Sequence, residues 1–188
     1  MINVNDFRPG TTFLHNNKND ILTVIESAHS KSGRGQAHVK VKAKNLRTGA
    51  ITSITFTGGD TVYPAVIDKR PAIYSYDDGD YSIFMDNSDY NEIRVNKSRL
   101  QWEKNFLIPG NEIKLRVYQQ TEIIGVDLPA SIEVEVTDAP PGVKGNSATN
   151  TTKTITIETG WQLQAPMFIN NGDRIIIGTD DGKYKSRA

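Results

Sequence analysis

The chain of 188 residues contains no cysteine. Disulfide bonds, thiol catalysis, iron–sulfur clusters and cysteine-based zinc sites are therefore excluded. Long apolar runs are missing too, because no stretch approaches the roughly 18 to 20 residues that cross a bilayer. The N-terminal sequence MINVNDFRPG has neither a basic start nor an apolar stretch after it, so it does not resemble a secretory signal. We expect a cytoplasmic protein without membrane association, held together by packing and hydrogen bonds.

Helical patterns and enzyme signatures are also scarce. The segments 86–93 and 98–107 each predict at most a short helical turn or two. Without long crossover helices, a parallel α/β sheet is excluded. The sequence has no phosphate-binding loop, no nucleophile elbow and no H-E-x-x-H motif, and its three histidines show no metal-ligand spacing. We therefore expect neither an enzyme nor a metal or other cofactor.

The chain is rich in segments where every second residue is apolar. Apolar and polar residues alternate in 39–44, 132–136 and 154–157, which is typical of half-buried antiparallel strands. Glycine next to asparagine or aspartate recurs between such segments and indicates hairpin turns. The aspartate-rich run 76–80 belongs to these turns, because a calcium loop needs more ordered spacing and a distal glutamate. The pattern predicts an all-β architecture.

Two prolines mark the expected domain boundaries. Proline lacks an amide proton and restricts the residue before it, so strands tend to end near Pro64 and Pro129. We predict three domains of about 60 residues each, 1–64, 65–128 and 129–188, each suited to a small five- or six-stranded barrel. No strict internal repeat is present, although the second and third segments share a similar rhythm of strands and turns.

Acidic residues are absent between Glu26 and Asp60, although the net charge of the whole chain is zero. The same window holds six cations and two histidines: Lys31, Arg34, Lys40, Lys42, Lys44 and Arg47, with His29 and His38. Lysine and arginine gain binding free energy by displacing counterions from phosphates, so this window predicts a polyanionic partner. The alternative is a solvated hairpin whose charges bind nothing specific.

The most informative segment is 31–36, with the sequence KSGRGQ. Arg34 lies between two glycines, where the backbone can turn sharply and little shields the guanidinium. This group offers five donors in a planar fork that suits phosphate and base edges. Aromatic residues are not interleaved with the cations, so gripping of a nucleic-acid backbone is favoured over stacking. A general single-stranded RNA-binding β-barrel protein is one function that fits.

Motifs in all three thirds of the chain, taken together, resemble those of bacterial translation elongation factor P. The resemblance rests on Phe7-Arg8-Pro9-Gly10, Gly33-Arg34-Gly35-Gln36-Ala37, Lys44-Asn45-Leu46-Arg47-Thr48-Gly49, Phe84-Met85-Asp86, Pro141-Gly142-Val143-Lys144-Gly145, Glu158-Thr159-Gly160 and Gly172-Asp173.

That resemblance implies an L-shaped molecule with an SH3-like (KOW-like) N-terminal barrel followed by two OB-fold barrels. Family members bind the 70S ribosome between the peptidyl and exit sites and relieve stalling at consecutive prolines. They are not enzymes, because ribosomal RNA performs the chemistry. A factor that holds the peptidyl-tRNA in a reactive pose would lower the entropic part of the barrier. The implied partners are the ribosome, peptidyl-tRNA, ribosomal RNA and the mRNA codon at the exit site, bound by a monomer.

The resemblance also assigns roles to residues of this chain. The loop of Lys31, Ser32, Gly33, Gly35 and Gln36 would reach the CCA end of the peptidyl-tRNA with Arg34 at its tip. Contacts on the codon and anticodon side would come from Gly145, Asn146, Ser147, Tyr184 and Arg187. From charge rather than motif, we predict contacts to the RNA backbone by His29, Lys40, Lys42, Lys44 and Arg47.

Several positions depart from the common family pattern. Many members carry Pro-Gly-Lys-Gly at the tip with a modified lysine, but here Ser32 and Arg34 replace the proline and the lysine. A lysine-specific modification at the tip is thus excluded. An arginine resembles the branch in which a glycosyltransferase rhamnosylates it, and an unmodified tip is the alternative. Asn146-Ser147 stands where Asp-Thr is common, which removes a negative charge. The elongation-factor-P-like paralogue shares the three domains and stays an alternative.

Overall fold

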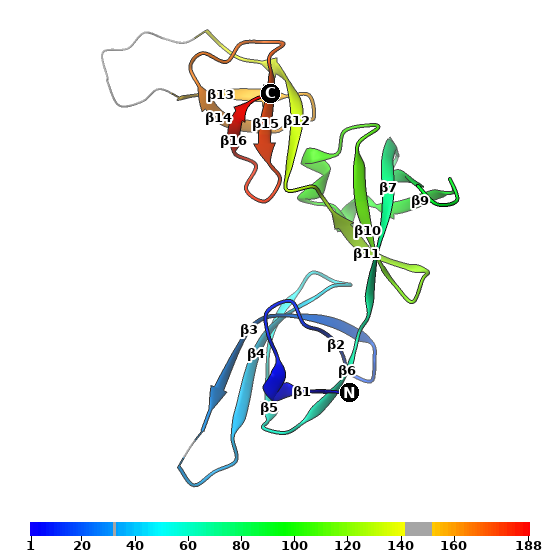
Figure 1. The fold of residues 1–188 in the computed structure, drawn as a ribbon, viewed down its shortest axis with the longest axis vertical. Helices are drawn as coiled ribbons and strands as arrows, with labels where there is room; N and C mark the ends of the chain where they lie inside the picture. Colours follow the sequence, from blue (N-terminus) through cyan, green and yellow to red (C-terminus); the bar gives the residue numbers. More distant parts are fainter. Residues whose placement is uncertain (32, 142–151) are drawn as a thin grey trace. The chain divides into compact units, whose positions relative to one another are not determined.

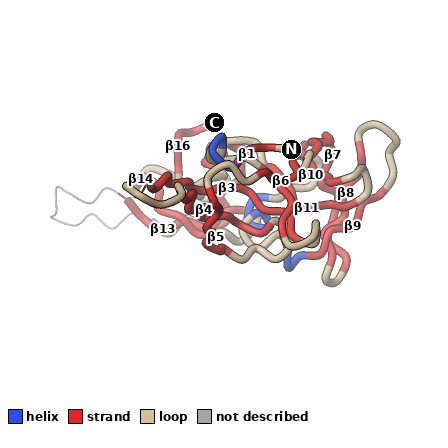
Figure 2. Tube along the Cα trace, turned by 90° about the horizontal axis from the view of Figure 1, so that it is seen from below, coloured by secondary structure: helices blue, strands red, loops and turns tan. Residues whose placement is uncertain are grey.

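A computed structural model describes residues 1–31, 33–141 and 152–188. These residues form β-strands and short 3₁₀ helices without any α-helix (Figure 2), which confirms the all-β prediction. Among them, no helix has the length and apolar character that crossing a membrane requires. The elements in chain order are β1 (Ile2–Asn3), η1 (Val4–Asp6), β2 (Thr12–His15), β3 (Asp20–Ser30), β4 (His38–Asn45), β5 (Ile51–Thr57), β6 (Thr61–Pro64), β7 (Ile67–Asp78), β8 (Tyr81–Asp86), β9 (Glu92–Asn96), η2 (Lys97–Arg99), η3 (Glu103–Phe106), β10 (Glu112–Tyr118), β11 (Glu122–Asp127), β12 (Ser131–Asp138), β13 (Thr152–Ile157), β14 (Gln162–Pro166), β15 (Arg174–Gly178) and β16 (Tyr184–Arg187).

The strands form three sheets (Figure 1). The first has six strands in the order β1-β6-β2-β3-β4-β5, and the other two have five strands each, β11-β10-β7-β8-β9 and β14-β13-β12-β15-β16. In both five-stranded sheets the first strand in sequence lies at the centre, with the second and third on one side and the fourth and fifth on the other. The similar rhythm of the second and third segments thus corresponds to an identical strand order.

One of the two predicted helical segments is confirmed. The segment 98–107 overlaps η2 and η3, but no helix forms in 86–93, where β8 ends at Asp86 and β9 begins at Glu92. A tight turn joins these strands because Oδ1 of buried Asp86 accepts hydrogen bonds from the amide and the hydroxyl of Ser88. Such local side-chain bonds compete with helix formation.

The core of the first sheet follows from the alternation in its strands. Residues 39, 41 and 43 of β4 are buried valine and alanine, whereas the lysines between them are exposed. Three aromatic rings pack beside them: the centroids of Phe7 and Phe13 lie 4.8 Å apart, and Phe56 meets each ring near a right angle. Edge-to-face and offset stacking are the favoured arrangements of aromatic pairs, so this cluster stabilises the sheet.

The third sheet encloses a separate core of isoleucine and valine side chains. The rings of Trp102, Phe106 and Trp161 pack at one side of it, with centroids 5.1 to 5.5 Å apart. The indole of Trp161 donates a hydrogen bond of 3.0 Å to the carbonyl of Gly182. A Cβ atom at Gly182 would lie only 2.7 Å from that indole, and φ there is +68°, so only glycine fits.

Contacts between residues divide the chain into two compact units rather than into the three predicted segments. One unit comprises Met1–Arg70 with Leu115–Gly125, and the other comprises Pro71–Lys114 with Val126–Ala188. The first unit gains the segment 115–125 because Tyr118 and Ile124 are buried in a small cluster with Ile21 and Ala65. The boundaries 1–64, 65–128 and 129–188 stay a prediction.

Candidate nucleic-acid interface

The acid-free window folds into one side of the first sheet. Strands β3 and β4 pair antiparallel from Leu22 opposite Asn45 to Ser30 opposite His38, with a register shift between Val24 and Glu26. Strand β4 also pairs with β5, so hydrogen bonds tie it on both sides. Figure 1 shows the β3–β4 hairpin projecting past the other strands of its sheet. We call β3, β4 and the loop 31–37 between them the basic arm.

One face of the basic arm carries its lysines. Lys40, Lys42 and Lys44 are exposed at alternate positions of β4. Residues directly opposite each other across antiparallel strands share a face, so Glu26 lies beside Lys42 and brings one carboxylate to this face. A shallow depression of about 500 Å³ follows the same face across β3, β4 and β5. The face offers three cations on a rigid, doubly paired strand.

The two histidines of the window lie on different faces. His38 has the same parity as the lysines of β4 and is exposed, so it extends their face toward the tip. His29 lies opposite Val39, whose side chain points into the core, and therefore belongs to the other face. The structure thus separates His29 from the lysines with which charge alone had grouped it. It adds His38, whose residue number is even like those of the three lysines and therefore indicates the same face of β4.

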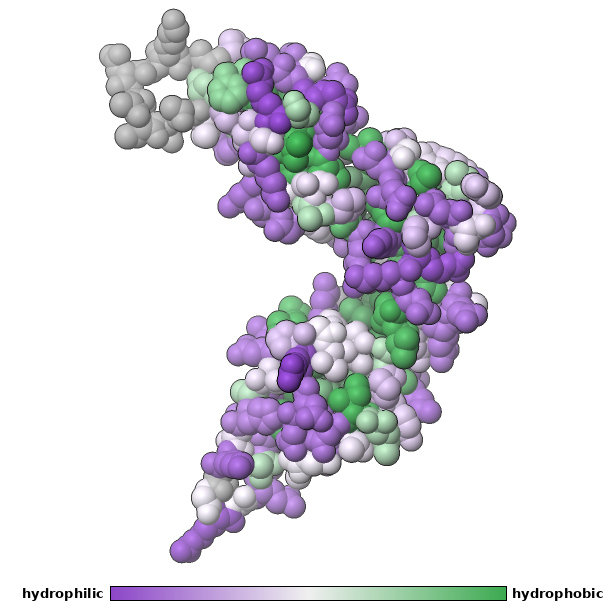
Figure 3. Space-filling model, viewed as in Figure 1, coloured by the Kyte–Doolittle hydropathy of each residue, from purple (hydrophilic) through white to green (hydrophobic). Residues whose placement is uncertain are grey.

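The tip loop presents Arg34 to solvent. Lys31 and the stretch 33–36 are exposed, and Ser32 lies outside the described residues. The far end of the loop is fixed, because the carbonyl of Ala37 accepts a hydrogen bond of 2.7 Å from the amide of Gly58. Among the described residues, none forms a hydrogen bond or ion pair with the Arg34 side chain. Figure 3 shows hydrophilic residues gathered toward this end of the hairpin. The guanidinium is therefore available to a partner.

Arg47, in contrast, is bound within its own unit. Its Nε and Nη2 atoms donate to the two carboxylate oxygens of Glu122 at 2.8 and 2.9 Å, and a further nitrogen donates to the carbonyl of Asn19. The hydrogen bond to Glu122 raises the pKa of Arg47, and the Tyr118 ring centroid lies 5.9 Å from the guanidinium. This half-buried pair holds the turn after β4 against β11. The RNA contact predicted for Arg47 stays a prediction that this geometry does not favour.

The predicted codon-side and anticodon-side residues are only partly described. Gly145, Asn146 and Ser147 lie outside the described residues. Tyr184 and Arg187 both belong to β16, where Tyr184 is half-buried against the core of the third sheet.

Arg187 is exposed but not free. Its Nη2 lies 3.2 Å from Oδ2 of Asp173, and its guanidinium lies 5.3 Å from the ring centroid of Phe168. A hydrogen bond from the backbone amide of Asn170 lowers the pKa of Asp173, and Arg187 lowers it further. Exposed Phe168 and Arg187 thus form a small surface beside β16.

No cluster of three or more histidine or acidic side chains suited to a metal ion occurs in the part of the chain that the structure describes. The expectation of a protein without metal stays a prediction.

Three family models match successive parts of the chain: the elongation factor P KOW-like domain at residues 3–62, the elongation factor P OB domain at 67–126, and the elongation factor P C-terminal domain at 132–187. The elongation factor P of Mycoplasmopsis synoviae (strain 53) is 48% identical over 188 residues, which cover all of both chains. That of Mycoplasmopsis agalactiae (strain NCTC 10123 / CIP 59.7 / PG2) is 49% identical and covers 100% of this chain and 99% of the relative.

A solved structure with a similar fold is the eukaryotic translation initiation factor 5A from Methanococcus jannaschii. It superposes with a TM-score of 0.50 at 18% identity, over 66% of this chain and 86% of that one. At this identity the likeness concerns the fold alone. Together with the KOW-like and OB family models, it confirms the expected barrel classes.

Proposed function

Because the chain belongs to the elongation factor P family of translation elongation factors, we propose that it binds the ribosome between the peptidyl and exit sites. There it would stimulate peptide-bond formation at consecutive prolines by positioning the peptidyl-tRNA. Ribosomal RNA would form the bond, so the protein itself would not be an enzyme. This role places it in the cytoplasm, acting as a monomer.

The basic arm is the observation that best supports this proposal. It combines an exposed lysine face, a doubly paired strand that holds this face in place, and a tip arginine that has no partner among the residues that the structure describes. Lysines on the face would neutralise phosphates of tRNA or ribosomal RNA. Arg34 would then meet the CCA end, where its planar fork of donors can bind phosphate or base edges. Holding reactants in a reactive geometry can remove several kcal/mol from a barrier.

The third domain would supply the second anchor. Tyr184 and Arg187 would lie toward the anticodon stem of the peptidyl-tRNA, and the loop with Gly145, Asn146 and Ser147 would lie near the mRNA codon at the exit site. The exposed pairing of Arg187 with Phe168 gives this surface a ring and a cation, which suit contact with RNA.

The state of Arg34 in the native host separates two forms of the proposal. If a glycosyltransferase rhamnosylates the arginine, the intact mass of the protein from its host exceeds the sequence mass by one deoxyhexose residue, and the added mass maps to the peptide with Arg34. An unmodified tip leaves the mass unchanged. Protein produced without the transferase then gives the activity of the bare arginine.

The proposal is tested by the rate of Pro-Pro-Pro peptide formation in a reconstituted translation system. We expect protein from the native host to accelerate this rate strongly and to leave a template without consecutive prolines unchanged. Absence of acceleration, with steeply salt-dependent binding to free RNA, would instead establish a general single-stranded RNA-binding protein. Acceleration confined to a different set of stalling motifs would identify the elongation-factor-P-like paralogue.

A further inference from the structure

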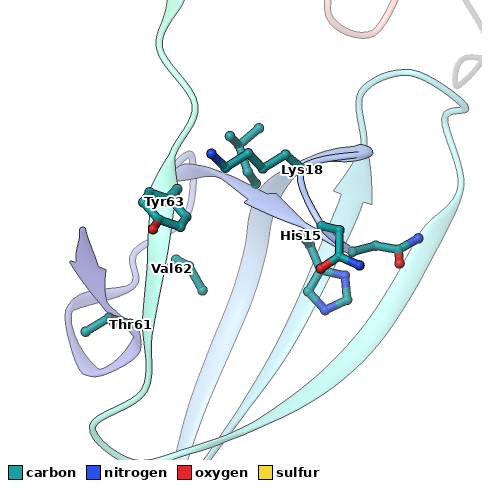
Figure 4. A pocket seen from close by; sticks show the side chains of 8 residues that line it. His15, Lys18, Thr61, Val62 and Tyr63 are labelled. Carbon is teal, nitrogen blue, oxygen red and sulfur yellow. The ribbon is translucent and has the colours of Figure 1, made fainter.

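A pocket lies in the first unit, apart from the face of the basic arm. It is lined by residues 14–18 of β2 and its following turn and by residues 61–63 of β6 (Figure 4), and its volume is about 410 Å³. We call it the turn pocket. None of its lining residues is acidic.

An exposed aromatic ring forms one wall of the turn pocket. Leu14 lies opposite Tyr63 in the β2–β6 pairing, so both lie on the face of the sheet opposite to that of neighbouring Val62, which is buried in the core of the first sheet. The Tyr63 side chain remains 52% exposed. Figure 4 shows the side chain of Lys18 reaching across the pocket to this ring, and its Nζ lies 4.7 Å from the ring centroid. The pocket thus pairs a flat π surface with a cation.

The backbone of the turn shows that Lys18 occupies a position better suited to glycine. Asn16, Asn17 and Lys18 all have positive φ, at 51°, 54° and 69°, and the amide of Asn19 closes the turn on the carbonyl of Asn16 at 3.0 Å. Asparagine tolerates this region, but lysine pays a steric cost there that glycine avoids. Such strain at an exposed turn indicates a use for the side chain, and here the side chain delivers a cation to the ring.

The nearby carboxylates do not hold this cation. Asp20 follows the turn and accepts a hydrogen bond from the side-chain amide of Asn45, and Asp60 accepts one from the amide of Thr57. Among the described residues, the ammonium of Lys18 forms no ion pair. A phosphate would therefore find a cation that is not already neutralised.

We propose that the turn pocket binds one unpaired nucleotide of an RNA partner, with its base stacked on Tyr63 and its phosphate on Lys18. On binding, the ammonium leaves the ring for the phosphate, which the flexible lysine stem allows. The carboxamides of Asn16 and Asn17 provide donors and acceptors at the same rim for base edges. The identification of RNA as the partner rests on the proposed function, whereas the nucleotide chemistry rests on the pocket.

Binding of a labelled single-stranded oligoadenylate to the full chain, followed by fluorescence anisotropy at several salt concentrations, tests this assignment. Tyr63→Leu is expected to weaken binding by about 5- to 150-fold, the measured range for one base stacked on an aromatic ring, without changing the salt dependence. Tyr63→Phe keeps the ring and is expected to bind like the wild type. Lys18→Gly is expected to reduce the slope of log affinity against log salt by about 0.7, the value for one phosphate of a single strand.

Lys18→Gly relieves the backbone of the turn, so this variant remains informative even if Tyr63→Leu fails to fold. Wild-type affinity in Tyr63→Leu together with an unchanged salt slope in Lys18→Gly would overturn the assignment. If only the arm variant Lys40→Gln/Lys42→Gln/Lys44→Gln loses oligoadenylate binding, the pocket fails and the proposed function stands. If the pocket variants behave as expected but Pro-Pro-Pro synthesis is not accelerated, the proposed function fails and the nucleotide site stands.

Discussion

The β3–β4 and β7–β8 hairpins both carry charged residues at a glycine-containing turn, but they use these charges in opposite ways. On the basic arm, Arg34 and the lysine face have no internal partners among the described residues. In the β7–β8 hairpin, Asp77 accepts hydrogen bonds from the hydroxyls of Tyr74 and Ser82, each at 2.8 Å.

Two ion pairs also lie near the β7–β8 turn. Asp77 lies 3.2 Å from Nζ of Lys97, and Asp78 pairs with Arg94 at 3.3 Å. Burial raises the pKa of Asp77, but the hydrogen bonds from Ser82, Tyr74 and Lys97 outweigh it and lower the pKa overall. A charge that is satisfied inside the fold contributes to folding, whereas an unpaired charge on a rigid strand is available to a partner.

The largest effect is expected at the tip of the basic arm. Arg34→Ala should reduce Pro-Pro-Pro synthesis by on the order of 10- to 100-fold, because a small misplacement of a reactant is that costly. The free energy of unfolding should change by less than about 0.5 kcal/mol, since the side chain is exposed. Asp80→Ala, at the tip of the other hairpin, is the matched control and should keep the wild-type rate. Full activity of Arg34→Ala would remove the role of the tip.

The lysine face should give the next largest effect. Replacing Lys40, Lys42 and Lys44 by glutamine should weaken ribosome binding and lower the slope of log affinity against log salt by about 2. A control variant in which the exposed residues Lys104 and Lys114 are replaced by glutamine also loses positive charge, and it should leave the slope unchanged. An unaltered slope in the arm variant would show that its lysines meet no phosphate.

Asp77→Asn should affect stability rather than activity. Loss of the charged acceptor should lower the free energy of unfolding by about 1 kcal/mol at neutral pH. The loss is no larger because the side chain is half-exposed and solvent weakens its ion pair. The lowered pKa of Asp77 means that its contribution is present above the unfolded value of about 4 and disappears as the pH falls through the folded value. Urea unfolding should therefore show a smaller stability loss in Asp77→Asn than in the wild type between about pH 5 and pH 2.

Arg94→Gln should have the smallest effect. Arg94 and Asp78 are 57% and 60% exposed, and the guanidinium lies 4.6 Å from the ring centroid of exposed Tyr81. Exposed ion pairs and cation–π contacts contribute at most about 1 kcal/mol, and salt screens the ion pair. Thermal unfolding at low and high salt should show a small loss that shrinks as salt rises. A loss that stays the same as salt rises would contradict the interpretation of Arg94 and Asp78 as an exposed, screened pair.

The sequence predicted those features that local pattern determines. Alternation in 39–44 correctly indicated a strand with exposed lysines and buried valines. The same alternation places His38 on the lysine face, apart from His29. The helical expectation for 86–93 was wrong because aspartate and serine near a chain reversal form a turn as readily as they begin a helix.

Contacts between distant parts of the chain could not be predicted from local pattern. Arg47 and Glu122 are 75 residues apart, and nothing in either segment marks the other as its partner. Without that pair, Arg47 appeared equivalent to the lysines. Lys18 and Tyr63 are brought together only by the pairing of β2 with β6 and by the left-handed turn. Strand register and turn geometry, which local pattern does not show, therefore determine whether a cation such as Arg47 or Lys18 forms an ion pair within the fold.

The register of β4 also fixes the reach of the basic arm. Its buried and exposed residues alternate strictly, so lengthening the arm by one residue would turn the lysines toward the core. Two residues added to each strand would preserve both faces and move Arg34 outward by roughly 7 Å, because each residue extends a strand by about 3.3 Å. The distance between the barrel and the tip can therefore change only in steps of two residues per strand if the lysines are to remain on the exposed face.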